Sequence, residues 1–268
     1  MNNVVIVENQ HDVLRLTLNR PERLNGFTNE VASLLLENVL NASCDNSIKV
    51  VVITGTGTTF SCGMDLDDLL SQGFSNTQIG KILDDLYNPL IRAIIDCPKP
   101  VLCGLNGVAA GGAVSLALAC DVIIAHHSAR FISAFSRIGL MPDCGGSWLF
   151  PHAFGLHRAK TFAMMEHGIS AEQAYVMGVV SKIAKDDEFA EAIAEASGYL
   201  ASASPQAMRL IKRSFHSAIS NSLASQLTLE RKWQDGASRE ADFREGVTAF
   251  QEKRKPSFKI NLGKHSQK

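Results

Sequence analysis

Short apolar runs alternate with longer amphipathic segments along the first part of the chain. The stretches VVIVE and VLRLTLNRP flank the turn NQHD and predict an N-terminal hairpin. Three later runs, KVVVITG (49–55), VLCGL (101–105) and VIIAH (122–126), are almost wholly apolar, which is typical of strands buried on both faces. Apolar residues recur at helical spacing in 28–43 and 79–97, so we expect a helix over each. The segment ARFISAF predicts a further short strand.

This alternation stops near residue 185. Residues 187–254 predict three or four helices and carry little strand signal. Strands that alternate with helices indicate a parallel α/β core. We therefore expect an α/β core over residues 1–190 and a C-terminal helical region over 191–268. The helical region either covers the core or forms a subunit interface.

The composition narrows the class of protein. The chain has 268 residues, of which 46% are hydrophobic and 20% charged, as in packed globular proteins. Its net charge of −1 offers no basic field for nucleic acid or an anionic membrane. No apolar run reaches the length of a membrane span, and MNNVVIVENQ lacks the pattern of a signal peptide. Six scattered cysteines without a CxxC pair indicate reduced thiols, so we expect a cytoplasmic protein that binds neither nucleic acid nor membrane.

The histidines do not indicate a metal site. Their spacing does not match that of metal ligands, and His126 and His127 are adjacent at the end of a predicted strand. We therefore expect no bound metal.

Two glycine-containing turns follow predicted buried strands, FSCGMDL (60–66) and NGVAAGGAV (106–114). A turn that ends a strand and opens a helix presents unpaired main-chain N–H groups, and the helix dipole favours negative charge there. Two such turns can direct two N–H groups at one oxygen atom, which makes an oxyanion hole for an enolate. Close packing of a helix on the sheet is the other open interpretation of Gly111 and Gly112. The spacing does not fit GxGxxG, and no GK[ST] follows.

A single carboxylate interrupts the apolar stretch SRIGLMPDCGGSWLF (136–150). Asp143 follows a proline and precedes a Cys-Gly-Gly step. One hypothesis is that its side chain caps a helix that begins near Cys144, since Asp is a favoured N-cap. The other is that Asp143 is a general base in an apolar pocket, where burial and neighbours set its proton affinity.

Several motifs together resemble one family. LNRPERLN (18–25), FSCGMDL, NGVAAGGAVSLALACD (106–121), FSRIGLMPDCGGSW (135–148) and REGVTAFQEKRKPSF (244–258) occur in the order typical of the enoyl-CoA hydratase/isomerase (crotonase) superfamily. The resemblance implies a spiral of ββα units followed by a helical trimerisation region. It also implies a homotrimer or hexamer and an acyl-CoA substrate, with coenzyme A as part of the substrate and no separate cofactor.

The resemblance also assigns site residues. It places the oxyanion-hole N–H groups on Met64 and Gly112, with Cys62 and Gly111 at the substrate. Hydratases of the family carry two glutamates, at positions that correspond here to Ser115 and Phe135. Phe135 is therefore expected to line the acyl pocket, and the resemblance favours Asp143 as the catalytic base.

The missing glutamates favour isomerisation over hydration. The stretches AFSRIGLMPDCGG and YNPL resemble those of ring-1,2-epoxyphenylacetyl-CoA isomerases, so we expect an isomerase that shifts a C=C bond through an enolate. A Δ3-Δ2 enoyl-CoA isomerase of aliphatic substrates, an enoyl-CoA hydratase in the broad sense, and a hydrolytic dehalogenase are the alternatives among enzymes. A non-catalytic scaffold is the alternative outside enzymes.

Each of the remaining candidate residues has two possible roles. Asp65 either lies near the acyl group or caps the helix LDDLL. Arg20, Arg23 and Lys253 either bind the phosphates of coenzyme A, as basic residues in these regions do in the family, or are solvated surface side chains.

Overall fold

The predicted buried strands form one six-stranded sheet. The computed structural model of the chain describes residues 3–71, 78–165 and 167–258. The strand order is β1-β2-β3-β5-β7-β10, and each neighbouring pair is parallel except the N-terminal hairpin β1–β2. Its strands are β1 (Val5–Gln10), β2 (Val13–Leu18), β3 (Val50–Gly55), β5 (Val101–Leu105), β7 (Val122–His126) and β10 (Lys182–Ala184).

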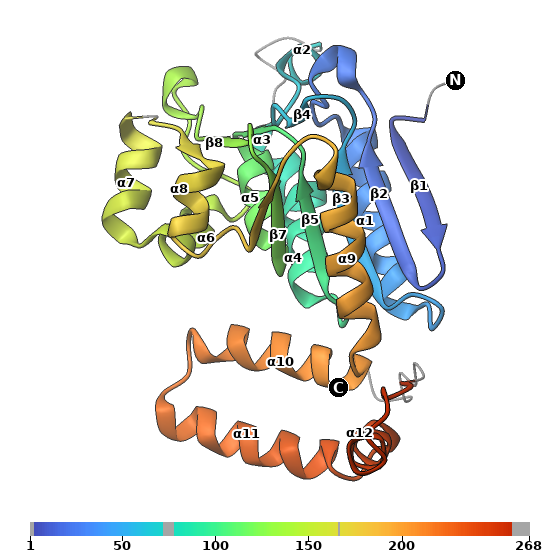
Figure 1. Cartoon of the computed structure of the whole chain (residues 1–268). Helices are drawn as coiled ribbons and strands as arrows, with labels where there is room; N and C mark the ends of the chain where they lie inside the picture. The colour runs from blue at the N-terminus through green and yellow to red at the C-terminus, as the bar shows by residue number, and fades with distance from the viewer. Residues whose placement is uncertain (1–2, 72–77, 166, 259–268) are drawn as a thin grey trace.

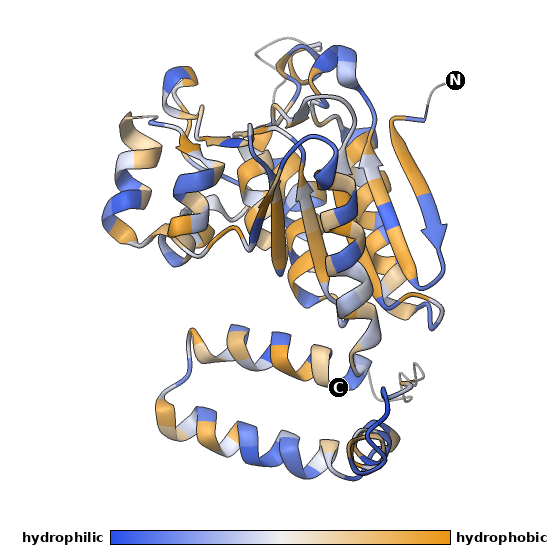
Figure 2. Ribbon diagram, viewed as in Figure 1, coloured by the Kyte–Doolittle hydropathy of each residue, from blue (hydrophilic) through white to orange (hydrophobic). Residues whose placement is uncertain are grey.

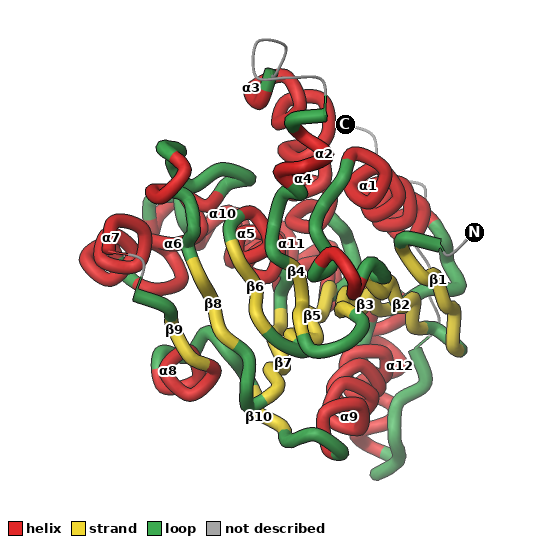
Figure 3. The backbone as a smooth tube through the Cα atoms, turned by 90° about the horizontal axis from the view of Figure 1, so that it is seen from above, coloured by secondary structure: helices red, strands yellow, loops and turns green. Residues whose placement is uncertain are grey.

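A second, four-stranded sheet lies at the carboxyl ends of the long strands (Figure 3). Its order is β4-β6-β8-β9, with the last pair antiparallel. The strands are β4 (Thr59–Ser61), β6 (Val108–Ala110), β8 (Arg130–Ile132) and β9 (Ile169–Ser170). The sequence predicts only β8 among them. The long strands β3, β5 and β7 are each followed by a short strand and then a helix, which confirms the expected spiral of ββα units.

Helices surround the two sheets (Figure 1). None in the described ranges is long and apolar enough to cross a bilayer. The core helices are α1 (Asn29–Cys44), α2 (Leu66–Leu69), α3 (Ile79–Ile82), α4 (Asn88–Asp96), α5 (Gly112–Ala119), α6 (Gly146–Phe154), α7 (Leu156–Met165), α8 (Ala171–Val176) and α9 (Glu188–Ser202). Within the described residues, two 3₁₀ turns lie in the connections, η1 (Pro21–Arg23) and η4 (Ser136–Ile138).

The large sheet is covered on both faces, which explains its nearly continuous apolar runs. On β3, Val51 and Ile53 pack into the core beneath α1, whereas Val50 and Val52 pack against α9 through Ile193. Successive side chains of a strand point to opposite faces, so both sets must be apolar. The strands are correspondingly hydrophobic along most of their length (Figure 2).

The helix expected over 79–97 is interrupted. It consists of α3, a π-helical turn (η3, Leu83–Tyr87) and α4. Pro89 lies in the first turn of α4, and a proline has no N–H for the carbonyl four residues earlier. A local π turn accommodates this missing hydrogen bond. The prediction of helical structure here is right, and the prediction of one regular helix is wrong.

The C-terminal helices form an arm that extends from the core (Figure 1). The arm consists of α10 (Pro205–Ala218), α11 (Leu223–Ala237) and α12 (Ala241–Gln251). The division expected at residue 190 falls inside α9, which packs on the sheet, so the arm itself begins after Ser202.

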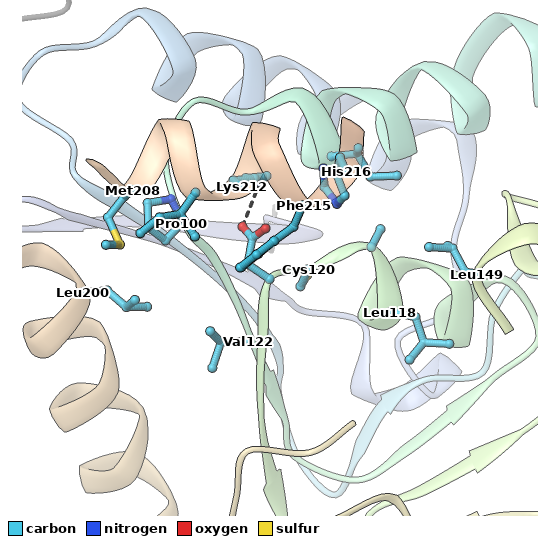
Figure 4. Close-up of a pocket in the computed structure, with 14 residues that line it drawn as sticks. Pro100, Leu118, Cys120, Val122, Leu149, Leu200, Met208, Lys212, Phe215 and His216 are labelled. Atoms are coloured by element: carbon cyan, nitrogen blue, oxygen red, sulfur yellow. Dashed lines mark hydrogen bonds and ion pairs between the residues drawn. The ribbon is translucent and has the colours of Figure 1, made fainter. Parts of the chain in front are cut away.

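One buried lysine fixes the arm to the core. Lys212 Nζ on α10 lies 2.8 Å from Asp121 Oδ2 and donates a 2.8 Å hydrogen bond to the Ile94 carbonyl. The pair lies at a largely apolar cavity of about 380 Å³ between α10 and the core, where Phe215 and Leu118 also form the lining (Figure 4). Breaking a buried pair by removing one partner is costly, so Lys212 positions α10 firmly.

Candidate active site

The two predicted glycine turns meet in the structure. Parallel pairing of β4 with β6 brings their following turns side by side. Gly63 has φ +84° and Gly111 has φ +55°, conformations that favour glycine. A Cβ atom on Gly63 would lie only 2.6 Å from the Ala110 carbonyl oxygen and 3.3 Å from the Gly112 nitrogen. The absence of a side chain at Gly63 therefore permits the close approach of the two turns.

These turns leave two N–H groups unpaired. The Phe27 N–H donates to the Gly63 carbonyl at 2.7 Å, and the Asp65 N–H donates to the Phe27 carbonyl at 2.9 Å, so this pairing skips the N–H of Met64. Gly112 is the first residue of α5, where an N–H has no partner within the helix. Within the described residues neither the Met64 nor the Gly112 N–H has a hydrogen-bond acceptor. Both residues line one cavity, as an oxyanion hole requires.

The cavity is about 290 Å³ and mostly apolar. Its walls come from the two turns, from α2 and α3, and from the segment that precedes α6. Among its described lining residues Asp143 is the only carboxylate. Asp143 Oδ1 lies 3.6 Å from the position that a Cβ of Gly112 would take, so the acid lies beside the unpaired N–H groups. The other lining residues are Phe27, Cys62, Met64, Leu66, Leu69, Ile79, Tyr87, Gly111, Gly112, Ala134, Phe135, Arg137, Ile138, Leu140 and Cys144.

Burial makes Asp143 a stronger base than an ordinary aspartate. It raises the pKa of Asp143, and a hydrogen bond from the Cys144 thiol offsets part of the rise. A carboxylate that loses water around its charge gains proton affinity. Since a general base works best when its pKa approaches the working pH, the direction of this shift suits proton abstraction.

Asp143 does not cap the following helix. The helix α6 begins at Gly146, and no side chain bonds to its first N–H groups. The contribution of Asp143 is its main-chain carbonyl, which accepts the Gly146 N–H at 2.7 Å. The capping hypothesis is therefore wrong, because the chain turns through Cys144 and Gly145, both at positive φ, before the helix starts.

Ser115 and Phe135 lie near Asp143, where the resemblance places two glutamates in hydratases. The fully buried Ser115 donates its hydroxyl hydrogen to the Asp143 carbonyl oxygen at 2.9 Å. Phe135 is buried and forms part of the cavity wall. Neither supplies an acid or a base.

Asp65 caps α2. Its side chain accepts the Asp68 N–H at 3.3 Å and forms 3.1 Å ion pairs with Arg20 and Arg23. Burial alone would raise the pKa of Asp65, but the hydrogen bonds from Arg23, Asp68 and Arg20 lower it below the ordinary value. The capping interpretation is confirmed, and Asp65 is not among the described residues that line the cavity.

The predicted phosphate-binding residues are separated within one chain. Arg23 lies beside the cap of α2, where it also pairs with Asp67 at 2.5 Å. Lys253 follows α12, in the arm at the opposite end of the molecule (Figure 1). Cys62 and Gly111, in contrast, line the cavity as expected.

Sequence reasoning missed two aromatic residues of the cavity. Phe27 comes from the loop before α1, and Tyr87 from the π turn before α4. The Tyr87 hydroxyl donates to the Phe27 carbonyl at 3.5 Å, and burial raises the pKa of Tyr87, so its ring stays neutral. The YNPL stretch was a signal for Tyr87, but its position in the site depends on contacts distant in sequence.

The comparisons with known proteins agree with this geometry. The family model described as enoyl-CoA hydratase/isomerase matches residues 8–261. The chain is 42% identical to the 1,2-epoxyphenylacetyl-CoA isomerase of Escherichia coli (strain K12) over 92% of this chain and 94% of that protein. It is 40% identical to a probable enoyl-CoA hydratase of Rhodobacter capsulatus, over 91% and 93% of the two chains. The crystal structure of an enoyl-CoA hydratase from Bacillus anthracis superposes with a TM-score of 0.91 at 28% identity, covering 97% of this chain and 100% of that one. The chain therefore belongs to the enoyl-CoA hydratase/isomerase family of the crotonase superfamily, whose enzymes act on acyl-CoA thioesters.

Proposed function

We propose that this enzyme is an acyl-CoA isomerase that moves a C=C bond through an enolate. The thioester oxygen accepts hydrogen bonds from the N–H groups of Met64 and Gly112, which strengthen as negative charge develops. Asp143 removes a proton from the acyl group and returns it at another carbon. Water takes no part in this sequence, and no further cofactor is needed.

The observation that carries the proposal is the single carboxylate beside the two unpaired N–H groups. A proton shuttle within one substrate needs one group that first accepts and then donates, and Asp143 has a raised pKa for this task. Hydration needs both an activated water and a proton donor. Among the described lining residues no second carboxylate is available, since Ser115 and Phe135 stand near Asp143 instead.

An aromatic acyl group is the preferred substrate. The cavity presents Phe27, Tyr87 and Phe135, whose rings can pack against a planar ring. The Escherichia coli relative at 42% identity is named as a 1,2-epoxyphenylacetyl-CoA isomerase, so we propose an epoxide of this kind. The same proton shuttle would there accompany expansion of the ring.

A linear enoyl group is the second candidate substrate. A trans-2-decenoyl-[acyl-carrier-protein] isomerase of Streptococcus mutans is 32% identical over 92% of this chain. The leucine and isoleucine side chains of the cavity wall, such as Leu66 and Ile138, can pack against an aliphatic chain.

Product masses distinguish isomerisation from the alternatives. The enzyme is incubated in ¹⁸O-labelled water with 3-enoyl-CoA, 2-enoyl-CoA and 1,2-epoxyphenylacetyl-CoA, and the products are resolved by chromatography and mass spectrometry. The proposal predicts a new isomer of unchanged mass. Incorporation of heavy oxygen as the dominant outcome would contradict it, and so would the absence of turnover with every substrate.

We also propose that the arm assembles the chain into a trimer or hexamer. Apolar side chains stand exposed on the arm of a single chain, among them Phe215, Leu223, Leu227, Phe243 and Phe250. Such exposure is typical of a surface that another subunit covers. Association would also allow Lys253 of one chain to approach the site of another. Light scattering tests the assembly, and a monomer at micromolar concentration would contradict it.

A further inference from the structure

We propose that His126, His127 and Asp186 form a site for one divalent transition-metal ion of the zinc class. The site lies outside the catalytic cavity, since none of the three is among its described lining residues. It does not depend on the proposed isomerase activity.

The sheet register brings the three side chains together. Strands β7 and β10 are parallel neighbours (Figure 3), and His126 is the Cα partner of Ala184. The His127 N–H donates to the Ala184 carbonyl at 2.9 Å, which fixes the turn after β7. Asp186 follows β10 by two residues, so its carboxylate emerges at the same edge of the sheet. The sequence alone showed only the adjacent histidines and gave no reason to connect them with Asp186.

The spacing of the ligand atoms fits a tetrahedral ion. Asp186 Oδ1 lies 3.1 Å from His126 Nε2 and 3.7 Å from His127 Nε2. The three ligand atoms all lie within 4.8 Å of one another. Zinc bonds of about 2.0–2.1 Å in tetrahedral geometry place neighbouring ligand atoms roughly 3.3–3.4 Å apart, so only small side-chain adjustments are needed. Asp186 is largely exposed, so a water molecule can fill the fourth coordination position of the ion.

Ser128 and Phe189 hold the His126 ring in place. Its Nδ1 atom lies 2.6 Å from Ser128 Oγ, and the Phe189 ring meets the imidazole edge-on at a centroid distance of 5.7 Å. Nδ1 also accepts the Ser128 main-chain N–H at 3.3 Å. A metal on Nε2 requires the ring hydrogen on Nδ1, so metal binding would break this contact and turn Nδ1 into a donor to Ser128 Oγ. Metal-bound histidines commonly have such a partner on the second nitrogen.

Zinc titration tests the site. The full chain, prepared without a histidine tag and stripped of metal, is titrated with Zn²⁺ against a chromophoric chelator. We expect one equivalent to bind, and His127→Gln and Asp186→Asn each to weaken binding by about tenfold or more. His157→Gln removes an exposed histidine on α7 and should leave binding unchanged.

Thermal unfolding provides an independent readout. An ion that binds the folded chain raises Tm, so Zn²⁺ should raise the Tm of the parent and of His157→Gln but not of Asp186→Asn. The proposal fails if the parent binds no stoichiometric zinc. It also fails if His127→Gln and Asp186→Asn bind zinc as tightly as the parent, which would indicate an adventitious ion only, for example on the exposed thiol of Cys44.

Discussion

The hydroxyl of Ser115 donates a hydrogen bond of 2.9 Å to the main-chain carbonyl of Asp143. This bond joins the oxyanion-hole helix α5 to the segment that carries the proposed base. A Cβ on Gly146 would lie 2.8 Å from Ser115 Oγ, so the space beside Ser115 is filled. A short hydroxyl therefore stands where a longer acidic side chain would displace Asp143.

Ser115→Ala should lower kcat and leave KM nearly unchanged, because it loosens the base without altering the cavity wall. The lost hydrogen bond costs about 1 kcal/mol of stability. Steady-state kinetics and urea unfolding measure the two effects. Ser197→Ala removes a similar buried hydroxyl bond on α9, to the Ala194 carbonyl, and should affect stability alone. Equal kcat values for the two variants would show that Ser115 does not position Asp143.

Gly63→Ala should abolish most activity and destabilise the fold. The new Cβ would meet the Ala110 carbonyl at 2.6 Å, and a positive φ in a non-glycine residue costs a further 1 kcal/mol or so. Gly57→Ala is the matched control, since Gly57 has φ +69° but its nearest neighbour would be Pro21 Cβ at 3.7 Å. Kinetics and thermal melts of both variants separate the contact from the backbone strain. Native-like activity in Gly63→Ala would contradict the close approach of the two turns.

Gly112→Pro tests the oxyanion hole, because proline has no N–H to donate. Loss of one such donor typically lowers kcat by about a hundredfold to a thousandfold. Gly112→Ala adds a Cβ, 3.3 Å from Cys144 Sγ, but keeps the N–H and should retain more activity. A folded Gly112→Pro enzyme with turnover like that of Gly112→Ala would remove Gly112 from the oxyanion hole.

The sequence predicts the long strands well because a few consecutive apolar residues are enough to indicate each of them. Both faces of β3 are apolar, through Val51 and Ile53 on one side and Val50 and Val52 on the other. A continuous apolar run of this length is typical of a strand that is covered on both faces. The motif order likewise identified the two N–H turns and Asp143.

The remaining features depend on contacts between distant segments. Strands β4 and β6 have only three residues each, and they form because they pair with each other across 48 or so intervening positions. Phe27 and Tyr87 enter the cavity through the packing of α1 and the π turn. The prediction that Asp143 caps α6 is wrong because Cys144 and Gly145 both have positive φ, so the helix begins only at Gly146. The residue types alone do not indicate this turn.

The raised pKa of Asp143 predicts a pH effect on stability with a definite sign. A carboxyl group whose folded-state pKa lies above its unfolded value contributes most at pH values below the unfolded pKa, about 3.9 for Asp. This contribution is lost as the pH rises through the folded-state pKa. Asp143→Asn should therefore be at least as stable as the parent at neutral pH, with a difference that shrinks in acid. Urea unfolding at several pH values measures it, and a difference that grows in acid would contradict the burial of the charge.

The most direct test of the mechanism is the isomerisation rate of Asp143→Asn. Asn has nearly the same shape as Asp but cannot accept the substrate proton, and loss of a general base costs about a hundredfold to ten-thousandfold in rate. The rate is measured with an acyl-CoA substrate that the parent enzyme isomerises, and thermal unfolding verifies the fold. The account predicts a loss in this range from a variant that melts no lower than the parent. Turnover close to the parent rate would show that Asp143 does not carry the proton.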